Sequence, residues 1–441
     1  MNHPNNDLMQ NDYAQLLIDV QKKSKITVNK SRDLRFLKEE IEENSKLSIS
    51  FNTLRRLFGF LEKTEPSIST LNTLAVYLGF SSYSAYKSNI INYDNWYFQQ
   101  NLQRIQSTNT VTSEDIEILR IGLLNAANTV YFAYFFSYFI ERKNIKTLEE
   151  IVKKIPYNGI SESNSLKFAT IVSLSLYRID KKDAFNIYKR LVKYDSFRNN
   201  VPLLFVDYSN LHNKYAKILT IIKQQSKKED DILFVKLMRF YWKFYSSKEY
   251  LHIEIKKPAK FDTFHPVLQG RYYAYLLLKS EGRDSNIEKK IIFDCKKSIK
   301  KNSVYEISFL LEEIIPSLIF KKNFAFLNEL LDAFYEEILE MDRWSSKTGH
   351  ALSLIAMANL NIEKGNLTMA QINLNLVELE KVELSYSDYV SLFYYQTKLQ
   401  ITYLNNAKDD NKKIQLILEN LIQKTKFTKF NQVLMNFSIS S

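Results

Sequence analysis

The chain contains the segment Ser48-Ile-Ser-Phe-Asn-Thr-Leu-Arg-Arg-Leu-Phe-Gly59, followed by Glu65-Pro-Ser-Ile-Ser-Thr-Leu-Asn-Thr-Leu-Ala-Val-Tyr-Leu-Gly-Phe80. In each segment, serines that can cap a helix precede a run of apolar residues at helical spacing. Gly79 stands where a left-handed residue would end the second helix. The pattern therefore predicts two short helices joined by a tight turn. The expected N-caps are Ser48 or Ser50 for the first helix and Ser67 or Ser69 for the second.

The first of these helices has two different faces. At 100° per residue, one arc collects the apolar residues Phe51, Leu54, Leu57, Phe58 and Leu61, and the opposite arc collects Asn52, Arg55, Arg56 and Gly59. Asparagine can pair with adenine, and arginine with guanine or a phosphate, through two hydrogen bonds each. The polar arc therefore predicts a DNA-contacting surface. The alternative is a surface helix with two solvated arginines.

The two segments also resemble a known group of DNA-binding domains. The patterns Ser50-x-x-Thr-Leu-x-Arg-Leu-x-Gly59 and Pro66-Ser-x-x-Thr-Leu-x-x-Leu-Ala-x-Tyr-Leu-Gly79 are similar to the third and fourth helices of lambda-repressor-like (XRE-type) helix-turn-helix domains. The resemblance covers roughly residues 30–88. We expect Asn52, Arg55 and Arg56 to enter the major groove of double-stranded DNA, with Lys30, Arg32, Arg35 and Thr53 steadying contacts to the phosphate backbone. A homodimer is expected because one such head reads few base pairs.

The remaining chain predicts an α-solenoid. Only eight glycines and seven prolines occur in 441 residues, which favours helices joined by short loops. From about residue 113, helical patterns alternate with polar turns such as Asp180-Lys-Lys-Asp and Glu363-Lys-Gly-Asn. Ala351–Val382 resembles a tetratricopeptide repeat in its small and apolar positions. We therefore expect an all-α protein with a tail over residues 1–9, a helix-turn-helix-like domain over 10–95, bounded by the Asn-rich stretch 89–95, and tetratricopeptide-like hairpins over 96–441.

This combination resembles bacterial peptide-sensing transcription regulators, in which the helical array holds a short peptide and controls the DNA-binding heads. We expect the array to bind a peptide or protein effector on a concave surface. Arg271, Tyr272 and Tyr275 are candidate effector contacts, since arginine can meet a carboxylate and tyrosines suit adaptable binding surfaces. The alternative is that these tyrosines pack between hairpins. The same choice between binding surface and core applies to the aromatic blocks Tyr131–Phe139 and Phe240–Tyr245.

The charge distribution leaves a second function open. The formal net charge of +12 makes a polyanionic partner a fair expectation, but residues 1–95 carry 12 basic and 11 acidic side chains. The N-terminal region is polarised rather than basic, because lysines and arginines dominate residues 22–38 and glutamates follow over residues 39–43. The competing interpretation is a non-enzymatic interaction scaffold whose N-terminal domain docks protein rather than DNA.

Nothing in the sequence predicts catalysis. The five histidines have no metal-ligand spacing, and a single cysteine, Cys295, excludes an intramolecular disulfide and a multi-cysteine metal site. No phosphate-binding glycine loop or nucleophile elbow is present. The first residues have no apolar core typical of a secretory signal, and no apolar run has the length of a membrane span. We expect a cytoplasmic regulator with no cofactor, no metal, no membrane partner and no enzymatic activity.

Overall fold

The computed structural model describes residues 13–62, 64–155, 162–246, 253–280, 284–299, 304–341, 347–405 and 408–432, and every regular element in these ranges is a helix. The expectation of an all-α protein is confirmed. The chain divides into two compact units, one up to Phe132 and one from Ala133 onward, and this division falls within helix α7 (Thr129–Glu141). The two units are described separately below.

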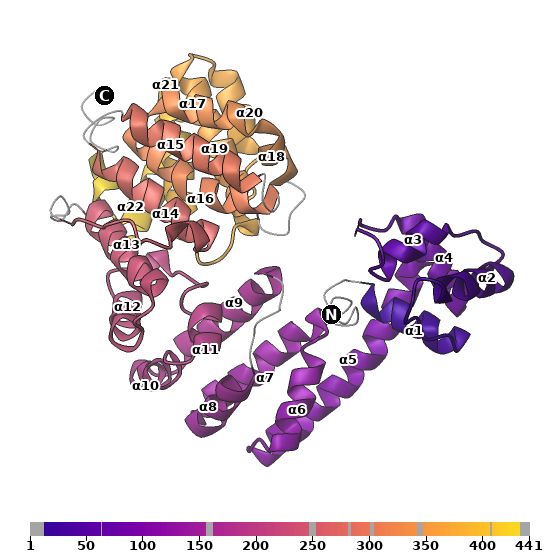
Figure 1. Ribbon diagram of the computed structural model, residues 1–441. Coiled ribbons are helices and arrows are strands. Elements are labelled where there is room, and N and C mark those ends of the chain that lie inside the picture. Colours follow the sequence, from indigo (N-terminus) through magenta and orange to yellow (C-terminus); the bar gives the residue numbers. More distant parts are fainter. Residues whose placement is uncertain are drawn as a thin grey trace. The chain divides into compact units, whose positions relative to one another are not determined.

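The first unit begins with four short helices around one core (Figure 1). The helices of this unit are α1 (Ala14–Ser24), α2 (Asp33–Ser45), α3 (Phe51–Leu57), α4 (Ile68–Leu78), α5 (Tyr83–Thr108) and α6 (Ser113–Gly122). Of the caps considered, Ser50 and Ser67 accept hydrogen bonds from the backbone N–H groups of Thr53 and Thr70. Gly79 ends α4 at a φ of 102°, as its place in the sequence predicts.

The stretch 89–95, where we expected the domain to end, lies inside α5, which runs unbroken from Tyr83 to Thr108. Asparagine has low helix propensity but does not forbid a helix, and packing of α5 against α4 and α6 supports it. Gly122 permits the second contact, because a Cβ built there would lie 2.2 Å from ring atoms of Phe98.

The second unit is a larger assembly of helices. Its members after α7 are α8 (Ile145–Lys154), α9 (Glu162–Arg178), α10 (Lys181–Leu191), α11 (Asp195–Asn200), α12 (Lys214–Gln225), α13 (Glu229–Tyr245), α14 (Pro266–Lys279), α15 (Ser285–Ile299), α16 (Val304–Lys321), α17 (Phe324–Ala333), α18 (Tyr335–Glu340), α19 (Thr348–Glu363), α20 (Leu367–Asn375), α21 (Ser387–Leu404) and α22 (Lys408–Thr425). Helix α16 lies between α14 and α19 and packs against both (Figure 1).

Three turns in this unit have the same backbone structure and the same type of helix cap. A residue with positive φ ends the preceding helix, and the asparagine after it caps the next one through its side-chain oxygen. These turns are Lys143-Asn144, Lys322-Asn323 and Gly365-Asn366, with φ values of 56°, 54° and 75°. The asparagines accept hydrogen bonds from the N–H groups of Thr147, Phe326 and Met369 at 3.2, 3.3 and 3.1 Å. The polar turns therefore predicted where helices end.

Within the described residues, no helix is both long and apolar enough to cross a lipid bilayer.

Candidate nucleic-acid interface

Helix α3 is short and firmly anchored. Leu54 and Leu57 are buried in the core of the first unit, and the Ser50 hydroxyl both caps the helix and lies 3.0 Å from the Thr53 hydroxyl. At the other end, Gly59 adopts a φ of 76° with nothing within 4 Å of a built Cβ. These contacts fix α3 and leave Asn52 exposed, with Arg55 and Arg56 partly exposed.

The ring of Phe51 brings two arginines from different helices together. The guanidinium of Arg35 on α2 lies 5.8 Å from the ring centroid, and that of Arg55 on α3 lies 5.9 Å from it. Arg55 Nη1 also donates a long hydrogen bond of 3.4 Å to Asn52 Oδ1, while its Nε is buried with no hydrogen-bond partner among the described residues. The result is one surface built from Arg35, Phe51, Asn52 and Arg55, which we call the α2–α3 surface. Planar guanidinium groups held against an aromatic ring are suited to phosphate and base recognition.

No carboxylate of the described residues forms an ion pair with Arg35, Arg55 or Arg56. Apart from the buried Arg55 Nε and the Arg55 Nη1 group that bonds Asn52, their donors therefore remain available to an anionic partner. Arg56 does not contact the Phe51 ring, so it is not part of the α2–α3 surface that Arg35 and Arg55 share.

The other predicted phosphate contacts gather around Asp33 at the start of α2. Asp33 Oδ2 accepts hydrogen bonds from the backbone N–H groups of Lys30 and Asn29 at 2.7 and 3.0 Å. Arg32 Nε lies 3.9 Å from Asp33 Oδ1. The hydrogen bond from Lys30 lowers the pKa of Asp33 below its usual value, so its charge partly offsets that of Arg32. The side chains of Lys30 and Arg32 remain exposed beside the first turn of α2.

Glu42 fixes the turn that leads into α3. Its Oε1 accepts hydrogen bonds from the Ser48 hydroxyl and the Ile49 backbone N–H, both at 3.0 Å, and its Oε2 accepts one from Lys38 Nζ at 2.5 Å. The hydrogen bond from Lys38, followed by that from the Ile49 backbone, lowers the pKa of Glu42 to about 2. Glu42 is therefore a positioning residue for α3, a role that the sequence analysis missed.

Sequence reasoning also missed two aromatic residues. It assigned Phe51 to the buried arc, but the ring is partly exposed and carries both guanidinium groups. Phe36, next to Arg35 on α2, has 63% of its surface exposed. A helical wheel offers the signal for Phe36, because it lies off the apolar face formed by Leu34, Leu37 and Ile41. The exposed glutamates of α2, Glu39 and Glu43, lie toward its other end.

The candidate effector residues are in the interior of the second unit. Arg271 is 3% exposed, and its Nε and Nη2 donate to Glu313 Oε1 at 2.9 Å and to the Tyr386 hydroxyl at 2.8 Å. Tyr386 in turn donates to Glu313 Oε1 at 2.7 Å, and the Tyr208 hydroxyl donates to Oε2 of the same carboxylate at 3.2 Å. A buried arginine needs a carboxylate, and here the chain itself supplies one.

The two tyrosines are equally enclosed. Tyr275 is 2% exposed, and its hydroxyl accepts from the Ile255 N–H at 3.0 Å and donates to the Ile253 carbonyl at 3.2 Å. Tyr272 packs against Phe261, with ring centroids 5.0 Å apart. Our expectation that Arg271, Tyr272 and Tyr275 face a ligand is corrected, because packing accounts for all three. The aromatic residues Phe240, Tyr241, Phe244 and Tyr245 are also buried.

No group of three or more histidine, cysteine, aspartate and glutamate side chains in the described ranges could hold a metal ion. His3 and His252 lie outside the described residues, and His265 is exposed and caps α14. Comparisons of the chain with protein-family models, with curated proteins and with solved structures find no match.

Proposed function

We propose that the chain is a DNA-binding transcription regulator whose N-terminal helices form a helix-turn-helix head and whose helical array binds a peptide or protein effector. In this proposal, α3 enters the major groove, with Asn52, Arg55 and Arg56 facing bases. Lys30, Arg32, Arg35 and Thr53 contact the phosphate backbone on the side of α2. No enzymatic step is proposed.

The observation that carries the proposal is the α2–α3 surface. Arg35 and Arg55 come from different helices, flank one ring at 5.8 and 5.9 Å, and pair with no carboxylate of the described residues. Guanidinium groups that have no carboxylate partner are suited to neutralise phosphates or to pair with base edges, so their presence on the α2–α3 surface favours a nucleic-acid partner. The resemblance of residues 30–88 to lambda-repressor-like domains supports the same assignment.

The direct test removes the two charges that share Phe51. Duplexes that bind the full chain are first selected from a random library, and affinity is then measured by fluorescence anisotropy. We expect Arg35→Gln with Arg55→Gln to weaken binding of the selected duplex by at least about tenfold, because the two-pronged base contact of Arg55 contributes about 1–3 kcal/mol and the phosphate contact of Arg35 is lost as well. Helical circular dichroism should not change.

A matched control removes an arginine of the same unit that lies outside the α2–α3 surface. Arg120 on α6 is exposed and paired with Glu117 at 2.7 Å. The variant Arg120→Gln should bind the selected duplex as the unchanged chain does. If Arg120→Gln lowers the affinity for the duplex as much as Arg35→Gln with Arg55→Gln does, the assignment of the interface to the α2–α3 surface is wrong. The binding would then be explained by non-specific charge attraction.

A second candidate function is protein docking by the same head. It is favoured by the exposed Phe36 and by Leu47, which is 41% exposed, together with the glutamates at the end of α2. Apolar side chains on a surface of mixed charge are typical of protein interfaces. The library selection separates the two functions, because a docking module enriches no duplex at any salt concentration.

A further inference from the structure

The second unit has a strongly basic face on three neighbouring helices. Helix α12 packs against both α10 and α13. Neither α12 nor the part of α13 after its first turn contains an acidic residue. Exposed or partly exposed cations of these helices form what we call the α10–α12–α13 face. They are Lys181 and Lys182 of α10, Lys214 and Lys217 of α12, and Lys236, Arg239 and Lys243 of α13.

Side-chain contacts join the three helices into one surface. The ammonium group of Lys217 on α12 lies 5.2 Å from the ring centroid of Phe185 on α10. One turn further along α12, the Thr220 hydroxyl accepts a hydrogen bond of 3.1 Å from Arg239 Nη2 on α13. The cations of the face are therefore neighbours in space, although they are spread over more than 60 residues of sequence.

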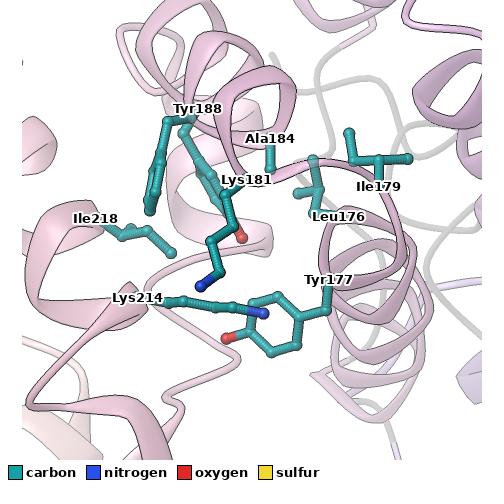
Figure 2. A pocket seen from close by; sticks show the side chains of 9 residues that line it. Leu176, Tyr177, Ile179, Lys181, Ala184, Tyr188, Lys214 and Ile218 are labelled. Atoms are coloured by element: carbon teal, nitrogen blue, oxygen red, sulfur yellow. The ribbon is translucent and has the colours of Figure 1, made fainter.

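Two lysines lie together at one end of the face. Lys181 is the first residue of α10 and Lys214 the first residue of α12. Figure 2 shows the Lys181 side chain extending toward Lys214 and Tyr177, and Lys214 Nζ lies 4.9 Å from the Tyr177 ring centroid. Because the N-terminal end of a helix is itself partly positive, the two helix starts add to the charge of the lysines.

The carboxylates at and near α10 are occupied within the chain. Asp180 accepts a hydrogen bond from the Lys182 backbone N–H at 2.7 Å, and Asp183 forms an ion pair with Lys143 at 2.5 Å. No carboxylate in the described ranges forms an ion pair with any cation of the α10–α12–α13 face. The face therefore has a positive potential that attracts an anionic partner.

The composition of the face favours an acidic peptide over nucleic acid. All but one of its cations are lysines, whereas arginine is the preferred residue for two-pronged recognition of phosphates and bases. Partly exposed apolar side chains also stand among the cations, namely Phe185, Ile232 and Trp242. A phosphate backbone offers no apolar group to them, but a peptide can present acidic and apolar side chains together.

We propose that the α10–α12–α13 face binds an acidic segment of the effector. Neighbouring helices lie about 8–10 Å apart, and an extended chain advances about 3.3 Å per residue. A segment that crosses the three helices therefore meets a new helix about every third residue. The expected segment has acidic residues three positions apart with apolar residues between them. This inference rests on the proposed effector role of the array and names the chemistry of its partner.

The test is isothermal titration calorimetry of the full chain with two synthetic peptides. One consists of three glutamate-leucine-serine repeats, and the other has glutamine in place of each glutamate. We expect the glutamate peptide to bind at least about tenfold more tightly than the glutamine peptide. Its affinity should fall as the salt concentration rises from about 50 to about 200 mM, because the attraction between exposed charges is screened.

Variants of the face locate the binding. Lys217→Gln with Arg239→Gln should weaken binding of the glutamate peptide by about tenfold, with unchanged helical circular dichroism. The matched control is Lys412→Gln with Lys413→Gln, which removes two exposed lysines of α22 and should have no effect.

Four results would overturn the inference. They are equal binding of the two peptides, no binding of either at about 1 mM, an equal loss in the control variant, and a face variant that loses affinity for the selected DNA duplex but not for the peptide. The last result would assign the face to nucleic acid. Loss of duplex binding in Arg35→Gln with Arg55→Gln is measured separately, so a failure of the acidic-segment inference and a failure of the DNA-binding proposal are distinguishable.

Discussion

Glu42 shows how one side chain sets the geometry of the α2–α3 surface. Its carboxylate joins α2 to Ser48 and Ile49, the two residues before the cap of α3. The distance between Arg35 and Arg55 depends on this turn, because both guanidinium groups must reach the Phe51 ring. A residue with no contact to DNA can therefore control how the arginines are presented.

The first prediction at this scale concerns Glu42→Gln. The folded-state pKa of about 2 is below the usual 4.5, so the ionised carboxylate stabilises the fold at pH values above 4.5. We expect the variant to have a lower thermal midpoint than the unchanged chain at pH 7. The difference should shrink as the pH falls from 4.5 toward 2, because the carboxylate of the unchanged chain then becomes protonated.

Thermal unfolding by circular dichroism at a series of pH values measures this difference, and Glu43→Gln is the control, since Glu43 is exposed on the same helix. A Glu42→Gln difference that stays constant across this pH range would contradict the assigned role. Duplex binding by the variant should also weaken, although Glu42 carries the wrong charge to touch DNA.

At the scale of single residues, the sequence could predict interactions between residues that are close to each other in the chain. Ser50, Ser67 and Gly79 act over three or four residues of chain, so their capping roles are readable from spacing. The burial of Arg271 was not readable, because its partner Glu313 is 42 residues away. The contact of both Arg35 and Arg55 with the Phe51 ring could not be predicted from the sequence either, because it depends on the angle between α2 and α3.

At the scale of elements, the packing of α14 on α16 is unusually close. A Cβ built on Gly270 would lie 2.8 Å from the Leu310 carbonyl oxygen and 3.1 Å from the Glu313 Cβ. The clash involves backbone, which cannot move aside as a flexible side chain can. Gly270 is therefore required by the contact between the helices, and the same contact places Arg271 beside Glu313.

We predict that Gly270→Ala destabilises the chain by about 1–2 kcal/mol, because overpacking outweighs the roughly 1 kcal/mol that alanine adds to helix propensity. Chemical denaturation followed by circular dichroism measures the change. Asn186→Ala, at an exposed position in the middle of α10, should leave stability unchanged or raise it slightly. A Gly270→Ala variant that gained stability in the same way would show that the helices do not approach as described.

The elements themselves were only partly predictable. The polar turn Glu363-Lys-Gly-Asn marked a helix end correctly, since a left-handed residue followed by an asparagine cap is a local signal. The asparagines within 89–95 suggested a break, but α5 continues through them. The low helix propensity of asparagine is outweighed by the packing of α5 against α4 and α6. The sequence pattern could not reveal this packing.

At the scale of the whole molecule, the charge is unevenly distributed. The formal net charge is +12, while residues 1–95 hold 12 basic and 11 acidic side chains, so most of the excess lies beyond them. Net charge alone therefore does not identify the DNA-binding head. The proposal depends on local cations, of which Lys30, Arg32 and Arg35 are assigned to phosphates, and the salt dependence of binding reports on such phosphate contacts.

The central claim, that the α2–α3 surface binds DNA, is tested most directly by a salt titration of the full chain with its selected duplex. Three phosphate-neutralising cations, Lys30, Arg32 and Arg35, predict a slope of log K against log salt of about −3. Arg35→Gln with Arg55→Gln should reduce the size of that slope by about 1, because one phosphate contact is lost, and should also weaken binding at every salt concentration, because the base contact of Arg55 is lost. Binding that does not depend on salt, or a double variant that keeps the full slope, would contradict the claim.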